Sequence, residues 1–163
     1  MRKSAIILCM SFIVFCSSCG WNSHSAQEFY GKMTAINDTL DLLTSTWHDQ
    51  LNKATIDKNY SALTPIRIEL GAFIARSRAA LPGLEQNDET EKILAKESTL
   101  LETRSSVVAE IYPNFDNLTE FTPNAEMSKN MTAVLNDLRE EKAAVAEVNK
   151  MLQAIAVKYK LKR

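Results

Sequence analysis

The chain of 163 residues contains only 4 glycines and 4 prolines, together about 5% of the chain against roughly 12% in average proteins. This shortage of turn-forming residues argues against β-sandwiches, barrels and disulfide scaffolds, while 45% hydrophobic and 24% charged residues are typical of a folded chain. The net charge of −1 provides no electrostatic footprint for a nucleic-acid partner.

The first 18 residues differ from the rest of the chain and have the three parts of a secretory signal peptide. These parts are a charged start at Arg2 and Lys3, an apolar stretch over residues 5–15, and the small residues Ser17 and Ser18. The apolar stretch is shorter than the roughly 20 residues that a membrane-spanning helix needs. We therefore predict a cleaved signal peptide at residues 1–18 rather than a permanent transmembrane anchor.

All three cysteines, Cys9, Cys16 and Cys19, lie within this region or directly after it. Residues 17–20 (Ser-Ser-Cys-Gly) resemble the lipobox of bacterial lipoprotein precursors. The resemblance implies that a diacylglycerol group is attached to the Cys19 thiol and that cleavage makes Cys19 the first residue. Acylation of Cys19 and removal of the other two thiols would leave no free cysteine in an oxidising compartment. The alternative is an ordinary signal peptide with incidental cysteines.

The same resemblance implies a location and a first partner. A lipid on Cys19 would anchor the chain to a membrane of the cell envelope, and by analogy with envelope sorting the non-acidic Gly20 favours the outer membrane. We expect residues 19–25 to form the lipidated cysteine and a polar tether, and residues 26–163 to form the folded domain.

From residue 26 onwards the apolar residues recur at alternating steps of three and four, which is the pattern of amphipathic helices. Breaks near residues 55–60, 82–88 and 113–123 divide the pattern into four segments. Their seams run through Phe29, Met33, Ile36, Leu40, Leu43, Trp47 and Leu51; Leu63, Ile66, Leu70 and Phe73; Leu94, Ser98, Leu101, Ser105 and Val108; and Met127, Met131, Val134, Leu138, Glu141, Val145, Val148, Leu152 and Ile155. We predict an all-α, up-down-up-down four-helix bundle, with an extended coiled coil as the alternative.

Two of these seams lead to specific expectations. Leu101, Leu138 and Leu152 should lie in the core, and Ser98 and Ser105 should occupy tight positions where a larger side chain would overpack. Glu141 is the only polar residue of the fourth seam. Because a lone buried carboxylate is costly, Glu141 is expected to tilt towards solvent or to pair with a neighbouring lysine such as Lys142.

Residues 57–60 (Asp-Lys-Asn-Tyr), with Leu63 and Arg67 downstream, are similar to a segment of small helical surface lipoproteins of bacteria. No catalytic constellation is recognisable beside this resemblance. The only two histidines, His24 and His48, belong to no Glu-x-x-His pair, so the di-iron bundle pattern is missing. We therefore expect a protein that is not an enzyme and that has no cofactor or metal.

The leading functional hypothesis is a non-catalytic, lipid-anchored envelope protein that acts through protein contacts. The alternative is a periplasmic helical-bundle carrier that holds haem or a small apolar ligand. In an antiparallel bundle, His48 would be level with Met127 and Met131, and histidine with methionine can ligate haem iron. An enzyme is the third hypothesis.

The two poles of the expected bundle differ in composition. A lipid on Cys19 would bring the basic C-terminal residues Lys158, Lys160, Lys162 and Arg163 close to anionic headgroups, unless they merely complement the helix dipole. The opposite pole is rich in aromatic residues. Because clustered aromatic residues mark contact surfaces, the sequence predicts a partner-contact tip there, unless the rings cap the core. The tip residues are Trp47, Tyr112, Phe115 and Phe121, with Tyr60 nearby.

Overall fold

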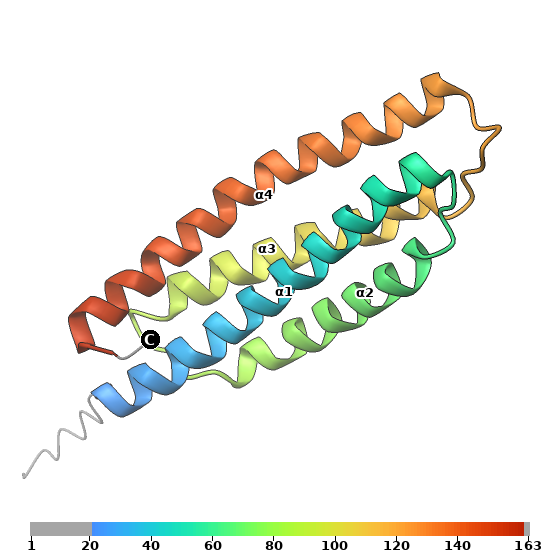
Figure 1. Ribbon diagram of the computed structural model, residues 1–163. Helices are drawn as coiled ribbons and strands as arrows, with labels where there is room; N and C mark the ends of the chain where they lie inside the picture. Colours follow the sequence, from blue (N-terminus) through green and yellow to red (C-terminus); the bar gives the residue numbers. More distant parts are fainter. Residues whose placement is uncertain (1–20, 162–163) are drawn as a thin grey trace, which may run out of the picture.

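The computed structural model describes residues 21–161, a range that is built from helices and contains no strand. The long helices are α1 (Ser23–Asp57), α2 (Leu63–Ala80), α3 (Glu91–Glu110) and α4 (Asn124–Tyr159), and two short 3₁₀ helices are η1 (Leu81–Gly83) and η2 (Tyr112–Phe115). Each long helix packs against the next one, and α4 packs against α1 (Figure 1). The predicted all-α helical bundle is confirmed.

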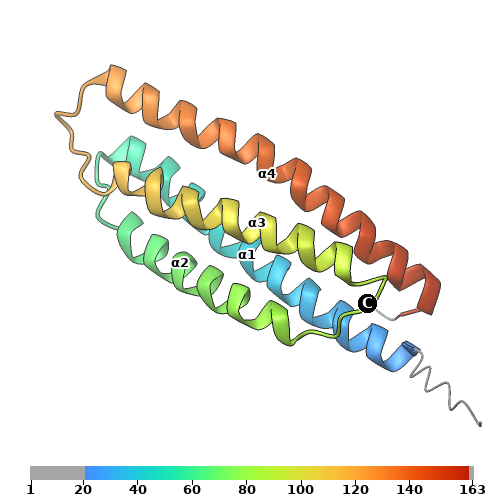
Figure 2. The same ribbon diagram turned by 180° about the vertical axis from the view of Figure 1, so that it is seen from behind.

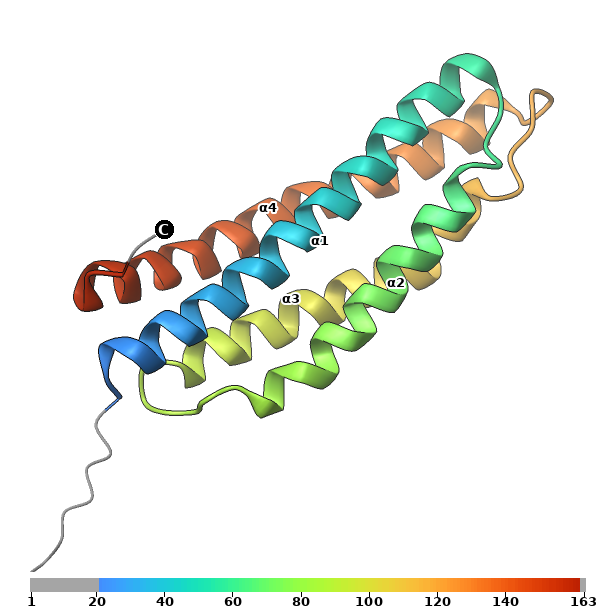
Figure 3. The same cartoon turned by 60° about the horizontal axis from the view of Figure 1, so that its bottom comes forward.

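Contacts at the ends of the helices show how they are paired. At one pole, which we call the base, the Ser23 hydroxyl lies 3.5 Å from the Tyr159 carbonyl oxygen, and the Tyr159 hydroxyl donates to Glu89. The start of α1, the end of α4 and the α2–α3 connection therefore meet there. The α1–α2 and α3–α4 connections lie together at the opposite pole, which we call the distal pole (Figures 1 and 3). Seen from behind, α3 lies between α2 and α4 (Figure 2).

The bundle begins earlier in the chain than the sequence suggested. The Asn22 side chain accepts hydrogen bonds from two backbone N–H groups of the first turn of α1, at 2.8 and 3.0 Å, and so satisfies donors that a helix end leaves unpaired. The Trp21 ring meets the Tyr159 ring edge-on, with centroids 5.0 Å apart. The prediction of a tether through residue 25 is therefore wrong for residues 21–25. Cys19 and the predicted signal peptide lie outside the described residues.

The core follows the predicted seams of α1 and α2. The buried side chains that were expected there include Phe29, Met33, Leu40, Trp47, Leu51, Leu63 and Leu70. Leu101 and Leu152 are buried as expected, while Leu138 is half-buried. These residues form one continuous core that runs the length of the bundle.

The seam predicted for α3 is partly wrong. Ser98 is exposed and Ser105 is half-buried, whereas Glu97 is 0% exposed and Arg104 is 2% exposed. Because α3 packs against both α2 and α4, it buries a face that is wider than a single heptad seam. The overpacking expected at Ser98 does not apply to an exposed side chain.

The fourth helix is held mainly at its two ends. Its fully buried residues are Asn130 and Val134 in the distal half and Val148, Leu152 and Ile155 towards the base. Residues 135–147, between these two groups, are exposed or half-buried. No helix in the part of the chain that the structure describes is long and apolar enough to span a membrane.

Candidate functional site

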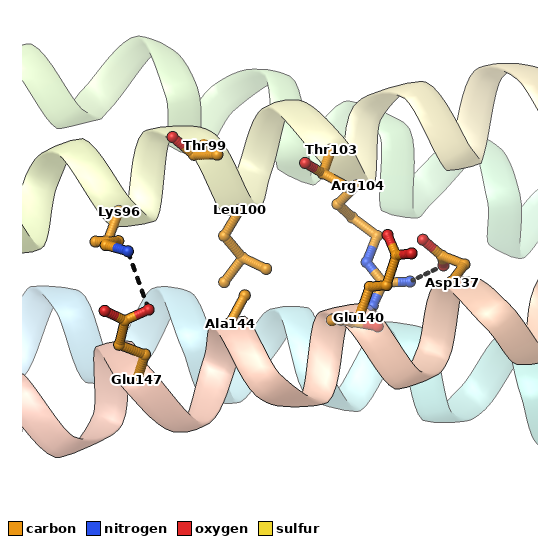
Figure 4. Close-up of a pocket in the computed structure, with 10 residues that line it drawn as sticks. Lys96, Thr99, Leu100, Thr103, Arg104, Asp137, Glu140, Ala144 and Glu147 are labelled. Carbon is orange, nitrogen blue, oxygen red and sulfur yellow. Dashed lines mark hydrogen bonds and ion pairs between the residues drawn. The ribbon is translucent and has the colours of Figure 1, made fainter.

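A cavity of about 190 Å³ lies between α3 and the middle of α4 (Figure 4). On α4 the cavity is lined by residues 137–147, which belong to the stretch that contributes no fully buried side chain to the core. Its lining is formed from α3 by Lys96, Thr99, Leu100, Thr103 and Arg104, and from α4 by Asp137, Glu140, Glu141, Ala144 and Glu147. Most of these side chains are polar or charged, so the cavity is a candidate binding site for a polar ligand.

Arg104 is the deepest charged group of this cavity. Its guanidinium forms ion pairs with two carboxylates of α4, Glu141 and Asp137, the second with Nη1 and Oδ2 at 3.6 Å. A buried guanidinium is strongly destabilising unless carboxylates compensate its charge, and here two of them do. Glu141 therefore points inward to Arg104, and the expectation that it tilts to solvent or pairs with Lys142 is wrong.

A chain of polar contacts links Arg104 to the opposite side of the core. Arg104 Nη1 donates to the Tyr112 hydroxyl oxygen at 3.2 Å, and this hydroxyl lies 3.4 Å from His48 Nε2. The guanidinium can only donate, so the hydroxyl oxygen accepts from Arg104, and which of Tyr112 and His48 donates in the second contact depends on the His48 tautomer. The Tyr112 ring is stacked on Trp47, with centroids 3.6 Å apart and planes 4° from parallel.

The protonation states in this cluster agree with its hydrogen bonds. Burial, supported by the nearby Arg104 charge, lowers the pKa of His48 to about 4, so the imidazole is neutral at pH 7. Burial also raises the pKa of Tyr112 to about 12, so the phenol keeps its proton. Burial raises the pKa of Asp137 as well, and the facing Arg104 counteracts this effect.

The end of the cavity away from Arg104 is lined by a more exposed ion pair. Lys96 Nζ lies 3.0 Å from Glu147 Oε2, and both side chains are about half exposed. Leu100 and Ala144 face each other between this pair and Arg104 (Figure 4). The cavity thus has a charged group at each end and an apolar middle. Residues 21–161 contain no group of three or more His, Cys, Asp or Glu side chains arranged to hold a metal ion.

A second buried polar contact lies between α3 and α1. The Glu97 carboxylate is completely buried, and its two oxygens lie 3.1 and 3.2 Å from the Asn37 side-chain nitrogen in the amide orientation that provides donors. Burial raises the pKa of Glu97 to about 7, and the Asn37 hydrogen bond reduces this effect. No ion pair involving Glu97 occurs within the described chain.

The predicted partner-contact tip is largely part of the core. Trp47, Tyr112 and Phe115 are each 0% exposed, because the Trp47 ring of α1 packs on both rings of η2. These three residues cannot present a surface in this structure, and the prediction is wrong for them. Phe121, in the α3–α4 connection, is 84% exposed, so a contact role for this residue stays a prediction.

The suggested haem-ligand set is not assembled. The groove that contains His48 on the α1 side of α4 is completed by Leu138, Glu141 and Lys142, not by Met127 and Met131. Along α4, this group begins seven residues after Met131, which corresponds to roughly 10 Å. The hypothesis of haem binding between these residues is therefore not supported by the geometry.

Sequence reasoning missed the buried ion pairs because charged residues on long helices are usually solvated. One signal was available. The α4 residues Asp137, Glu140, Ala144 and Glu147 follow steps of three and four, and so share one helix face, with Glu141 beside it. This acidic face adjoins the seam instead of lying opposite it, which is unusual for an amphipathic helix. Arg104 alone among the basic residues of α3 faces it from within the core.

No protein-family model matches the chain, and no curated protein or solved structure matches it.

Proposed function

We propose that this protein is a non-catalytic, lipid-anchored protein of the cell envelope that acts through contacts with another envelope protein. The observation that carries the proposal is the packing of Trp21 against Tyr159 at the base, because only Gly20 separates Trp21 from Cys19. A lipid on Cys19 would hold the base directly against a membrane. The lipobox at residues 17–20 supports the anchor, and Gly20 supports the outer membrane.

An anchor at the base turns the distal pole away from the membrane. Two large apolar side chains are exposed at this pole, Phe121 (84%) and Ile56 (79%). Aromatic side chains are favoured centres of protein–protein contacts. Phe121 is therefore the residue through which we propose that a partner binds.

The anchor is tested by mass spectrometry of the protein purified from its own membranes. The expected product begins with an acylated Cys19, and Cys19→Ser should move the protein to the soluble fraction because the anchor is lost. Cys16→Ser is the matched control and should remain membrane-bound. A mature chain that begins elsewhere and carries no acyl group would contradict the anchor.

The contact is tested by cross-linking in intact cells. Phe121→Ser should abolish the cross-linked product and leave the melting temperature unchanged, because the side chain is exposed. Leu42→Ser removes an exposed apolar side chain from the side of α1 and should keep the product. Equal cross-linking by the wild type and by Phe121→Ser would show that the contact lies elsewhere.

A further inference from the structure

A hollow of about 610 Å³ lies at the distal pole, between η2, the α3–α4 connection and the first turns of α4. The α3–α4 connection extends further from the base than the α1–α2 connection does (Figures 1 and 3). Thr122 lines the hollow, and the exposed Phe121 is its neighbour in the chain. The hollow therefore lies beside the residue through which we propose that a partner binds, and its volume is typical of a binding site.

The lining of the hollow is polar but has no net charge. Among the described residues that line it, only Glu126 and Lys129 are charged, and their charges cancel. Asn114, Asn117 and Asn130 contribute side-chain amides. A side-chain amide has a carbonyl acceptor and N–H donors, as does the peptide group of a protein backbone. The hollow is therefore complementary to uncharged peptide groups and not to an ion.

Asn130 is the buried amide of this set, with an exposed fraction of 8%. Its Nδ2 donates to the Asn114 carbonyl oxygen at 3.4 Å, while its side-chain oxygen accepts no hydrogen bond from residues 21–161. Asn130 lines the hollow, and this oxygen is not sealed from solvent. Because the polar groups of buried residues are normally paired, Asn130 offers an acceptor that an N–H group of a ligand can reach.

Phe121 belongs to a tight turn that is held by its own hydrogen bonds. The Thr119 N–H donates to Thr122 Oγ1 at 2.9 Å, and the Thr122 N–H donates to the Thr119 carbonyl oxygen at 3.1 Å. The Phe121 N–H donates to Thr119 Oγ1 at 3.3 Å. The turn thus presents the aromatic ring in an ordered backbone before any partner arrives, which lowers the entropic cost of binding.

We propose that the hollow binds an extended, uncharged segment of the partner protein. Peptide groups of this segment hydrogen-bond with Asn117 and Asn130, and one of its apolar side chains packs on Phe121. Backbone hydrogen bonds combined with side-chain contacts are a common mode of peptide recognition. A helical segment does not fit this chemistry, because its peptide groups are already bonded to one another. The inference rests on the proposed distal contact and names the kind of segment that makes it.

Photo-cross-linking in intact cells tests the inference, with benzoylphenylalanine in place of Phe121 in the full chain. In this background, Asn117→Asp should reduce the yield of the cross-linked product about tenfold, because it removes an amide donor and adds a charge. Asn117 is exposed, so the variant should keep its melting temperature. Asn149→Asp, exposed on α4 outside the hollow, makes the same change in net charge and should keep the yield.

The cross-linked product also identifies the bound segment. Mass spectrometry of its peptides should show a segment without Asp, Glu, Lys or Arg beside the cross-linked residue. A synthetic copy of that segment should shift the side-chain amide resonances of Asn117 and Asn130 in the purified protein. The amide resonances of Asn149 should not move.

The two proposals fail in different ways. Absence of any cross-linked product would contradict the distal contact and this inference with it. An equal yield with and without Asn117→Asp would leave the distal contact in place and overturn the hollow as the binding site. A strongly charged segment, a cross-link to a saccharide instead of a peptide, or unchanged Asn130 resonances would overturn it as well.

Discussion

Glu97 and Arg104 are ionisable residues two turns apart on α3, and both are buried. Arg104 has two carboxylates and a hydroxyl as partners, so its positive charge is compensated. Glu97 has only the Asn37 amide, which can donate hydrogen bonds but cannot neutralise a negative charge. Glu97 is therefore the side chain whose ionisation opposes folding, while Arg104 connects α3 to α4.

Glu97 should make the protein less stable as the pH rises. Its pKa is about 7 in the folded protein against 4.5 ordinarily, so the folded state binds more protons than the unfolded state between these values. Stability therefore falls as the pH rises through this range, by up to roughly 3 kcal/mol. Glu97→Gln should be more stable than the wild type at pH 8 and should depend less on pH, as measured by urea unfolding at pH 5 and 8. Glu102→Gln, exposed on the same helix, is the control, and an unchanged pH slope in Glu97→Gln would contradict the assignment.

His48 should produce the opposite dependence on pH. Its pKa is about 4 in the folded protein against 6.5 ordinarily, so the unfolded state binds more protons between these values. Stability is fully present above pH 6.5 and is lost as the pH falls towards 4, by about 1–3 kcal/mol for this partly buried ring. His48→Gln should lose less stability than the wild type between pH 6.5 and 4.5 in thermal melts. If the two proteins lose the same stability, His48 is not the group that titrates.

At the scale of the helix, the packing of α3 between α2 and α4 decides which of its residues are buried. Leu101 is 0% exposed, and Leu101→Ala should lower the free energy of unfolding by about 2–5 kcal/mol. Ser98, one turn away, is exposed, and Ser98→Leu should change it by less than about 0.5 kcal/mol. Chemical denaturation of both variants measures the difference. A loss of several kcal/mol in Ser98→Leu would mean that Ser98 is tightly packed, as the sequence pattern predicted. That result would contradict the exposed position of Ser98 in the structure.

The middle of α4 depends on ion pairs, because residues 135–147 bury no side chain fully. Arg104→Met would leave Asp137 and Glu141 without their cation, and breaking a buried pair costs about 3–5 kcal/mol. We expect faster hydrogen exchange at the amides of residues 135–147 in this variant, with α1 and α2 less affected. Arg139→Met removes an exposed arginine of α4 and is the control. Equal exchange in both variants would show that Arg104 does not hold α4 in place.

The helices themselves were predictable from the sequence, because apolar residues at steps of three and four define a buried face whatever the partner is. The start of α1 was also encoded locally, by the capping residue Asn22, although the polar composition of residues 22–25 favoured a tether. The site was not predictable in the same way. Whether Arg104 is solvated or buried depends on Asp137 and Glu141, which are more than thirty residues away in the chain. Likewise, Trp47 and Tyr112 look like surface aromatics until their stacking is known.

At the scale of the whole molecule, the two poles carry different kinds of exposed residue. The base has Val157 and Lys158 exposed beside Trp21 and Tyr159, which are half-buried, and aromatic and basic residues are favoured at a membrane surface. Lys158 is partly neutralised by Glu89, at 2.7 Å. The distal pole instead exposes Phe121. An anchored bundle would therefore stand on the membrane with its long axis away from the lipid.

The orientation can be tested with the two tryptophans of the chain. Trp21 belongs to the base, whereas Trp47 is buried towards the other end of α1, at a distance of roughly 36 Å along the helix. Brominated lipids quench tryptophan fluorescence only at short range. In vesicles that contain such lipids, the acylated protein should lose part of its fluorescence, and the variant Trp21→Phe, which retains Trp47 alone, should lose none. Quenching of Trp21→Phe to the same extent as the wild type would mean that the bundle lies along the membrane, and an unquenched wild type would mean that its base is held away from the lipid.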